Sequence, residues 1–427
     1  MTSDAGPSPP VPHPVRDAHP FWRWSLGLAL VVVVYYGTLA LCPRLLFVLG
    51  VNHFNAWFVD LFAVLASNDA VARGLDPYAP NPLDYLQRPH VYSHWWLYLR
   101  HLGLTRADVT WLGLGLVGSY LLAVLTWLRP RSMRQLLWYA AVLCSSQILL
   151  GLERGNNDLV VFLVLLPVVP CLLSSRRLVR LGATFLVAAG AMLKYYPAAA
   201  VLVLLAVADR REARARLIVT LLLMTAAGLS VAGDLTGFGS RAPSPAGLLS
   251  FGATGFFNEL GWTGWAPKLL CAGFGVAAVV WSWSGRMLRD WEPAPAQQSD
   301  WLHFVLGAVL LTGCFFTSMN FGYRWIFAVW LAPMLWLLVR DSDAPAPVRR
   351  LARGTMGLLL LALWWQPVCC IVISGLIGKL KGDAIMGLAK WAFLIGQPFE
   401  WAFFLCLVVF LTHFMRQRLA FLLSPPA

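Results

Sequence analysis

Four basic residues of this chain stand inside short polar motifs whose composition suits an anion site. They are Arg88 in YLQRPHVYSHWW, Arg154 in LERGNNDLVVF, Lys194 in LKYYP and Arg324 in SMNFGYRWIF. Three of these motifs are very short turns between apolar segments, so their polar groups must lie at or below a membrane surface. Charge is costly there and commonly marks a functional site. We therefore expect the four cations to bind phosphate oxygens together, although a single cation could instead snorkel to the interface.

Neutral or acidic polar residues accompany the cations and could bind a phosphate or the hydroxyls of a sugar. The candidates are Asn156, Asn157, Asp158, Tyr78, Tyr195, Asn320 and Tyr323. Asp158 stands just before an apolar segment, so it could also cap a helix and pair with Arg154.

Carboxylates in the same part of the chain could act as a general base. Asp60 opens a predicted helix over residues 60–73, and Asp69 lies two turns further along it. In a single-displacement sugar transfer, one carboxylate removes the proton of the acceptor hydroxyl as it attacks the anomeric carbon. Cations stabilise the departing phosphate. We expect Asp60 to be this base, with Asp69 in reserve; the alternative for Asp60 is a structural role at a helix N-terminus.

We expect no metal and no cofactor, because a phosphate leaving group does not require a metal. His90 and His94 have an i, i+4 spacing, but their loop contains proline and offers no third ligand nearby. The eight cysteines lie mostly in apolar segments and none has CxxC spacing, so they are predicted to be small core residues without disulfides.

The elements that must position these side chains are membrane helices. The chain has 427 residues, of which 59% are hydrophobic and only 12% charged, with a mean hydropathy of +0.67. A soluble domain carries about a quarter charged residues. Long apolar segments without alternation indicate helices and not barrel strands, because backbone polar groups in lipid must pair internally. The prediction is an all-α, polytopic membrane helical bundle.

About twelve transmembrane helices are expected, and residues 157–208 stand apart from the others. The predicted spans are 24–41, 110–128, 135–152, 159–173, 181–193, 197–208, 217–232, 265–283, 301–317, 325–339, 354–377 and 393–412. The spans between residues 157 and 208 are shorter than the roughly 20 residues that cross a bilayer. They are therefore predicted to be short or re-entrant helices.

Every second connector is short and rich in arginine, which predicts the orientation. The basic residues are Arg129, Arg131, Arg134, Arg176, Arg177, Arg180, Arg210, Arg211, Arg214, Arg216, Arg286, Arg289, Arg340, Arg349, Arg350, Arg353, Arg416 and Arg418. The positive-inside rule places them and both termini in the cytoplasm, and the four polar motifs outside it, in a plasma (inner) membrane. Because the net charge of +13 is spread over these clusters and not over one face, nucleic acid is not an expected partner.

The predicted organisation is a single transmembrane domain over residues 23–427, preceded by a disordered cytoplasmic tail over residues 1–22. The first extracytoplasmic loop, residues 42–109, is the longest and is expected to contain an amphipathic helix near residues 60–73.

The ordered motifs resemble the bacterial polyprenol-phosphate-dependent glycosyltransferases of the GT-C superfold, and among them glycosyltransferase family 87, which includes mycobacterial mannosyltransferases. The similarity covers residues 24–415 and rests on Asp60 followed by GLDPY, then ERGNNDL, LKYYP and NFGYRWIF. It implies a GT-C-like fold, and an acidic base in the first extracytoplasmic loop, which matches Asp60. It also implies that Arg154, Asn156, Asn157 and Lys194 lie near the lipid phosphate. The chain departs from the family pattern at Val59 and Leu61, which flank Asp60 in place of a second acid, and at Tyr195.

The sequence thus favours an integral-membrane glycosyltransferase. It would move a sugar, a hexose such as mannose or else arabinose, from a polyprenyl-phosphate donor to a lipid or glycan acceptor, with membrane lipids as its surroundings. The alternative is a transporter or flippase for a lipid-linked or anionic solute, which would need charged groups near the bilayer midplane.

Overall fold

The computed structural model describes residues 22–423, with gaps at 52, 207–209, 237–240, 242–244, 246, 248–249, 286–287, 289–290, 318 and 377–381. The predicted disordered tail lies outside the described residues except for Trp22, which begins the first helix. Arg286, Arg289 and the side chains of Arg210, Arg211 and Arg214 lie outside them as well.

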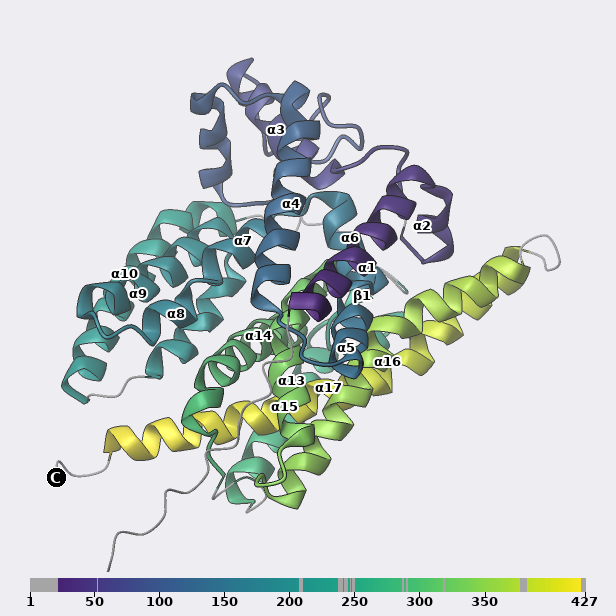
Figure 1. The fold of residues 1–427 in the computed structure, drawn as a ribbon. Helices are drawn as coiled ribbons and strands as arrows, with labels where there is room; N and C mark the ends of the chain where they lie inside the picture. Colours follow the sequence, from purple (N-terminus) through teal and green to yellow (C-terminus); the bar gives the residue numbers. More distant parts are fainter. Residues whose placement is uncertain are drawn as a thin grey trace, which may run out of the picture.

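The described chain is an all-α bundle of helices (Figure 1). Its longer helices are α1 (Trp22–Leu41), α3 (Val59–Ala72), α4 (Val109–Trp127), α5 (Met133–Leu143), α9 (Arg177–Leu193), α10 (Arg210–Leu235), α13 (Trp265–Ser284), α14 (Gln298–Thr317), α16 (Ala346–Leu376) and α17 (Gly382–Leu423). The shorter helices are α2 (Arg44–Val48), α6 (Ser146–Arg154), α7 (Asp158–Leu165), α8 (Val168–Leu172), α12 (Gly255–Glu259) and α15 (Ala332–Arg340). Segments of 3-10 helix are η1 (His94–Leu102), η2 (Arg106–Asp108), η3 (Tyr196–Leu205), η5 (Pro295–Gln297) and η6 (Gly322–Leu331).

Eight of the described helices are long and apolar enough to cross a membrane, and a ninth span results if the bent pair α5 and α6 counts as one. The chain is therefore a multi-pass helical membrane protein. The remaining predicted spans fall on α7 with α8, on α9 and on η3, which do not reach that length. The expected number of twelve is thus higher than the number of full-length helices. The shortfall lies between residues 133 and 205, which includes the region predicted to be short.

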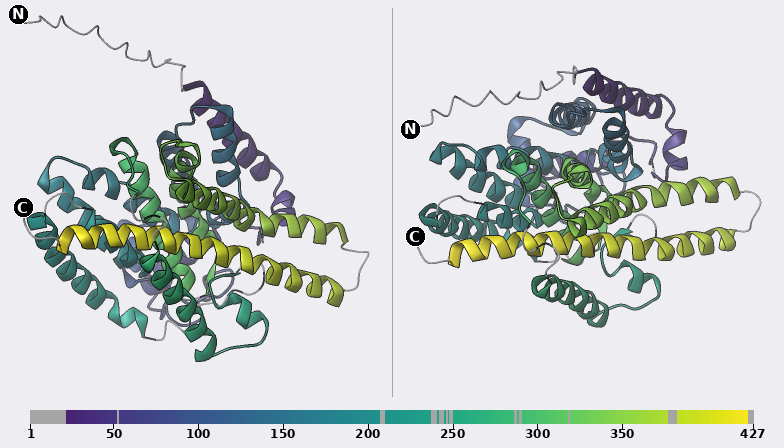
Figure 2. Two further views of the ribbon diagram at one scale, coloured as in Figure 1. Left: turned by 90° about the horizontal axis from the view of Figure 1, so that it is seen from below. Right: turned by 60° about the horizontal axis from the view of Figure 1, so that its bottom comes forward.

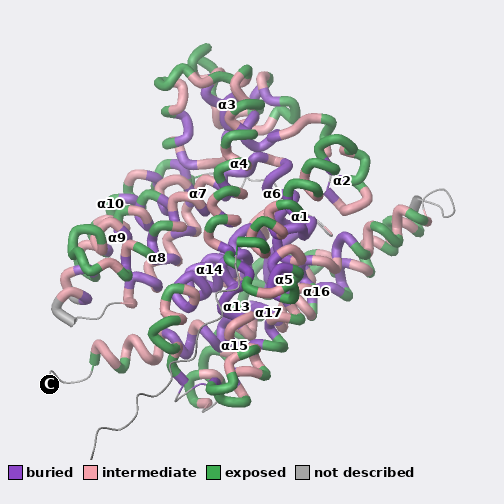
Figure 3. The backbone as a smooth tube through the Cα atoms, in the orientation of Figure 1, coloured by how far each residue is buried: buried purple, intermediate pink, exposed green. Residues whose placement is uncertain are grey.

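The centre of the bundle is formed by α14 and by η6 with α15. The most apolar windows of these two segments are 72% and 78% buried, against 17% for α1 and 11% for α13. Buried positions accordingly gather around α14 and exposed ones on the outer helices (Figure 3). Aromatic rings fill the centre, as where Phe162 stacks on Trp330 with ring centroids 4.4 Å apart. An all-round apolar helix belongs in such a core, whereas the outer helices turn apolar side chains to lipid.

Helices α16 and α17 are the two longest and lie side by side along the bundle (Figure 2). Both contain an internal proline, Pro367 and Pro398. Within the described residues, one pair of two-residue strands, β1 (Ser250–Phe251) and β2 (Asn320–Phe321), joins in antiparallel fashion just before η6.

Helix α3 stands at one end of the molecule, at the top of Figure 1. It forms within the 42–109 segment, where an amphipathic helix was predicted, but it is buried on most of its sides and not on one face. The reason is that η1, η2, α4 and α6 pack around it, and the loop containing Arg88 closes over its first turn.

Candidate functional site

The first turn of α3 is docked on the turn between α6 and α7. Helix α6 ends at Gly155, which has a left-handed backbone with φ +57° and lets the chain reverse. A side chain at Gly155 would meet Phe58, whose N–H donates to the Glu153 carbonyl at 2.8 Å. This close backbone approach sets Asp60, two residues after Phe58, against the GNND turn.

Asp60 is buried, with 6% of its surface exposed, and its carboxylate is held on both oxygens. Oδ1 accepts a hydrogen bond from Arg88 Nη1 at 3.0 Å, and Oδ2 accepts one from Asn156 Nδ2 at 2.6 Å. The Arg154 guanidinium lies 3.9 Å from Oδ1. Because a carboxylate has about four acceptor positions, each oxygen retains capacity for a hydroxyl proton.

Arg88 is fixed in place by a second carboxylate. Asp84 accepts from Arg88 Nε at 2.9 Å and from Nη2 at 3.0 Å, the two-point geometry that arginine makes with carboxylates. Nη2 also donates to the Val59 carbonyl at 2.7 Å. Arg88 therefore ties the loop that follows Asp84 to the start of α3, and Asp84 orients the guanidinium that contacts Asp60.

A second carboxylate centre forms around Asp158, the first residue of α7. Both Lys194 and Arg324 donate to it in short contacts, and the Tyr196 hydroxyl donates to Oδ1 at 2.8 Å. The guanidinium of Arg324 also lies over the Tyr196 ring, 4.3 Å from its centroid. Two cations therefore share one buried carboxylate, which leaves this centre with a net positive charge.

Asn156 joins the two centres through one carboxamide. Its nitrogen donates to Asp60, and its oxygen accepts from Lys194 Nζ at 3.0 Å and from the Asp158 N–H at 3.0 Å. The chain uses Asn156 to start α7 and, with the same side chain, to connect the predicted base with the predicted phosphate cations. Asn157 is buried beside it, and its amide nitrogen has no hydrogen-bond partner among the described residues.

Burial lowers the pKa of Lys194 to about 8, while the Asp158 carboxylate opposes the shift by raising it. The ammonium is therefore protonated at neutral pH but closer to deprotonation than an exposed lysine. Its charge also faces the rings of Tyr92 at 5.2 Å and Tyr323 at 5.6 Å.

Arg154 belongs to the Asp60 side of the site. Its guanidinium packs on the Phe54 ring at 4.6 Å, and its Nε lies 3.2 Å from the Glu153 carboxylate. Glu153 in turn contacts His53 Nδ1 at 2.7 Å.

The turn before η6 supplies the remaining predicted residues. The Asn320 amide donates to the Cys314 carbonyl at 3.0 Å, and its oxygen accepts from Arg324 at 3.3 Å and 3.4 Å. Asn320 is therefore a support for Arg324. Tyr323 lies between Lys194 and Arg324, with the Arg324 guanidinium 5.3 Å from its ring centroid.

Three predicted residues lie outside this network. The Tyr78 hydroxyl donates to Asp234 at 3.0 Å, and the same carboxylate contacts His94 Nδ1 at 2.9 Å. Burial and Asp234 raise the pKa of Tyr78 to about 12. Burial also raises the pKa of Tyr195, and the charge of Asp234 adds to that shift. Asp69 pairs with Arg106 at 2.7 Å, about two and a half helical turns from Asp60.

The structure adds residues that the sequence did not single out. Tyr196 contacts Asp158, whereas its neighbour Tyr195, which was predicted to bind the donor or the sugar, is influenced by Asp234 instead. Asp84 orients Arg88, and Tyr92 packs against Lys194. The only sequence signal for these three was their place inside or beside the polar motifs.

His90 and His94, which were not expected to bind a metal, have different partners. His90 is buried with its Nε2 3.2 Å from the Ser93 carbonyl, and burial lowers its pKa to about 4, whereas His94 contacts Asp234.

Acidic pairs with Asp-x-Asp spacing are common metal ligands, and the chain has one, Asp341 and Asp343, in the connector after α15. There Asp341 accepts a hydrogen bond from Gln297 at 3.0 Å. Within the described residues no group of three or more His, Cys, Asp or Glu side chains is arranged to hold a metal ion.

A scan against protein-family models, a search of curated proteins and a search of solved structures each found no match to this chain. The arrangement of the side chains therefore carries the functional argument.

Proposed function

We propose that this protein is an integral-membrane glycosyltransferase that moves a sugar from a polyprenyl-phosphate donor to a lipid or glycan acceptor. The sugar would be a hexose such as mannose, or arabinose. The observation that supports this most is the Asn156 carboxamide, which joins the Asp60 carboxylate to the Lys194 ammonium within one hydrogen-bonded network. A base and a leaving-group site must lie this close for a single displacement.

The proposed division of labour follows the charge of the two centres. At the Asp158 centre, the two cations Lys194 and Arg324 share one carboxylate. The excess positive charge attracts a phosphate to this centre. Around Asp60 there are three carboxylates, those of Asp60, Asp84 and Glu153, against the two guanidinium groups of Arg88 and Arg154. The proton acceptor is therefore placed at the Asp60 centre. Lysine and arginine together carry eight N–H groups, enough for Asp158 and a phosphate to share.

In the proposed step the acceptor hydroxyl oxygen attacks the anomeric carbon, and its proton passes to Asp60. The bond between the anomeric carbon and the phosphate oxygen breaks with inversion. Its electron pair leaves with the polyprenyl phosphate, whose charge Lys194 and Arg324 stabilise. No oxidant, metal or other co-reactant is needed to balance this reaction.

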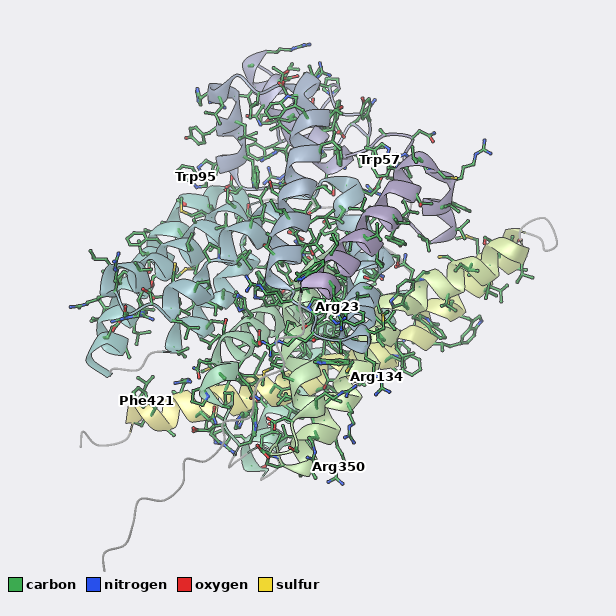
Figure 4. The ribbon with its side chains drawn as sticks, in the orientation of Figure 1. Arg23, Trp57, Trp95, Arg134, Arg350 and Phe421 are labelled. Atoms are coloured by element: carbon green, nitrogen blue, oxygen red, sulfur yellow. The ribbon has the colours of Figure 1, made fainter. Side chains whose placement is uncertain are left out.

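The proposed setting is a plasma (inner) membrane with both termini cytoplasmic and the site on the extracytoplasmic side. Its support is the positive-inside rule, applied to the arginine-rich connectors at the end of the bundle away from α3. Arg134 and Arg350 lie toward that end, and Trp57 and Trp95 toward the end with α3 (Figure 4).

The test compares Asp60→Asn with Asp69→Asn, the same change on the same helix away from the network. Membranes with each variant receive labelled polyprenyl-phosphate mannose or arabinose, and transfer to membrane acceptors is counted. We expect Asp60→Asn to lose about 10²–10⁴-fold in rate at unchanged expression, the worth of general-base catalysis. Asp69→Asn should retain most activity. Full activity of Asp60→Asn would remove it from the mechanism, and selective loss in Asp69→Asn would make that residue the base.

A transporter or flippase is the second candidate, and Glu400 favours it. This carboxylate lies in the middle of α17, where a transport pathway requires polar groups. Cysteine labelling at Asn157 and Lys194 distinguishes the two functions: reagent access from both sides of the membrane supports transport, and access from one side supports the enzyme.

A further inference from the structure

A small polar cavity lies inside the helical bundle, separate from the charged network. It has a volume of about 20 Å³, room for one water molecule or one small ion. Its polar lining consists of Gln147 of α6, Ser250 of β1, Gln366 of α16, and Gln397 and Glu400 of α17. Polar groups at such a position are expensive unless they are satisfied, so their hydrogen bonds are informative.

The hydrogen bonds leave an excess of oxygen. Gln147 Nε2 donates to Gln366 Oε1, Gln366 Nε2 donates to the Gly50 carbonyl at 3.1 Å, and Gln397 Nε2 donates to Glu400 at 3.1 Å. Every amide nitrogen therefore has an acceptor. The oxygens of Gln147 and Gln397, by contrast, have no donor among the described residues, although both side chains are at least 95% buried.

Two prolines free backbone carbonyls next to the lining of the cavity. Gln366 and Gln397 are each followed by a proline inside their helix, Pro367 and Pro398. Proline has no N–H to donate to the carbonyl four residues earlier. The carbonyls of Leu363 and Leu394, which directly follow the lining residues Ala362 and Phe393, therefore lose their helical donors.

Glu400 is the acidic group in the lining of the cavity, and it carries a negative charge when it is ionised. Its described hydrogen bond comes from the neutral amide of Gln397, and no described Lys, Arg or His forms an ion pair with it. A charged group within a membrane helix normally has a partner. Oxygen atoms around one carboxylate, without nitrogen or sulfur ligands, are the surroundings that hard cations prefer.

We infer that this cavity is a binding site for one monovalent cation, and that its ligand is sodium. A single carboxylate neutralises one positive charge, and the volume suits an ion close to water in size. The candidate ligands are Glu400, the side-chain oxygens of Gln147 and Gln397, and Ser250 Oγ. This site does not depend on the proposed glycosyl transfer.

Two residues that line the cavity, Gln147 and Ser250, pack against the turn that carries Arg324. A Cβ atom on Gly322, the first residue of η6, would lie 1.9 Å from Gln147 Oε1. Ser250 pairs with Phe321 in the two-stranded ladder. Bound sodium thus contacts groups packed on both sides of the Asn320–Arg324 turn and should stabilise it.

The test is thermal unfolding of the purified full-length protein in detergent. Sodium chloride, potassium chloride and choline chloride are compared at constant ionic strength. We expect a saturable rise of at least about 2 °C with sodium, a smaller one with potassium and none with choline. Glu400→Gln should abolish the sodium response, whereas Glu292→Gln, the same change at an exposed position, should keep it.

A second variant guards against misfolding of Glu400→Gln. Gln397→Met keeps the carboxylate but removes one oxygen ligand, so half-maximal stabilisation should need about tenfold more sodium. Equal responses to sodium and choline in the wild type would overturn the proposal. A full sodium response in Glu400→Gln would also overturn it. If the wild type responds equally to sodium and choline and Glu400→Gln is more stable than the wild type, then a proton and not a sodium ion neutralises Glu400.

Discussion

The basic residues at the two ends of this bundle differ in their surroundings. At the end with α3, Arg88, Arg154, Lys194 and Arg324 have side chains between 7% and 23% exposed, and each contacts a carboxylate. At the other end, arginines of the short connectors such as Arg134 and Arg350 are exposed (Figure 4).

The difference shows that position decides what an arginine contributes. An exposed arginine in a short connector interacts with water and lipid headgroups, and its number and side set the orientation of the helices. A buried arginine must have its charge compensated, so it comes with carboxylates and amides in fixed geometry. Only the second arrangement can present a defined set of donors to a phosphate.

The largest contrast between the two ends is expected from Arg324→Gln and Arg350→Gln. Arg324→Gln removes one of the two cations on buried Asp158, and breaking such a pair costs about 3–5 kcal/mol. Sugar transfer from the polyprenyl-phosphate donor should fall about 10²–10³-fold. Arg324→Lys, which keeps the charge, should recover part of both losses; equal activity of Arg324→Gln and wild type would remove Arg324 from the site.

Asn156→Ala tests whether the Asp60 and Asp158 centres, at the end with α3, depend on each other. It removes the carboxamide that joins Asp60 to Lys194 and leaves buried partners unsatisfied, at a cost of about 1–3 kcal/mol. We expect a lower unfolding temperature and a lower maximal transfer rate. Asn157→Ala is the matched control, because the Asn157 amide nitrogen makes no described hydrogen bond; a larger effect there would contradict the assigned role of Asn156.

The pH dependence of donor binding should report on Lys194. Because its pKa is lowered to about 8, its ammonium is present below that pH and is lost as the pH rises through it. The Michaelis constant for the donor should therefore increase above about pH 8. Lys194→Arg stays charged throughout this range and should flatten the profile. An unchanged profile in Lys194→Arg would assign the titration to another group.

The smallest effect on transfer is expected at the exposed end. Arg134→Gln and Arg350→Gln should each change transfer less than twofold and stability by about 0.5 kcal/mol or less, because both side chains are exposed. Their effect should be confined to the orientation of the helices, which protease accessibility of the connectors measures. A large loss of transfer in correctly oriented protein would mean that the two ends are not separate in function.

The sequence was informative where polar residues interrupt apolar segments. The motifs around Arg88, Arg154, Lys194 and Arg324 were predicted to work together, and their side chains do meet around Asp60 and Asp158. The all-α membrane fold followed from composition, because lipid allows few alternatives.

Other features depended on packing that no local pattern encodes. Tyr195 and Tyr196 are adjacent in the chain, and only the course of η3 decides which of them contacts Asp158. Asp69 was a reserve base because it shares α3 with Asp60, but the helix carries it to Arg106. The predicted twelve helices include the short ones: eight or nine are long enough to cross a membrane, and the segments on α7 with α8, α9 and η3 are shorter, as was predicted for residues 157–208.

The measurement that tests the central claim most directly is the binding of polyprenyl phosphate to the purified protein, compared with the uncharged polyprenol of the same chain length. Native mass spectrometry of wild type and Arg324→Gln gives both affinities without requiring the sugar to be known. The account predicts that the wild type binds the phosphate at least tenfold more tightly than the alcohol, and that Arg324→Gln loses this preference. Equal affinity of the wild type for the two lipids would contradict it.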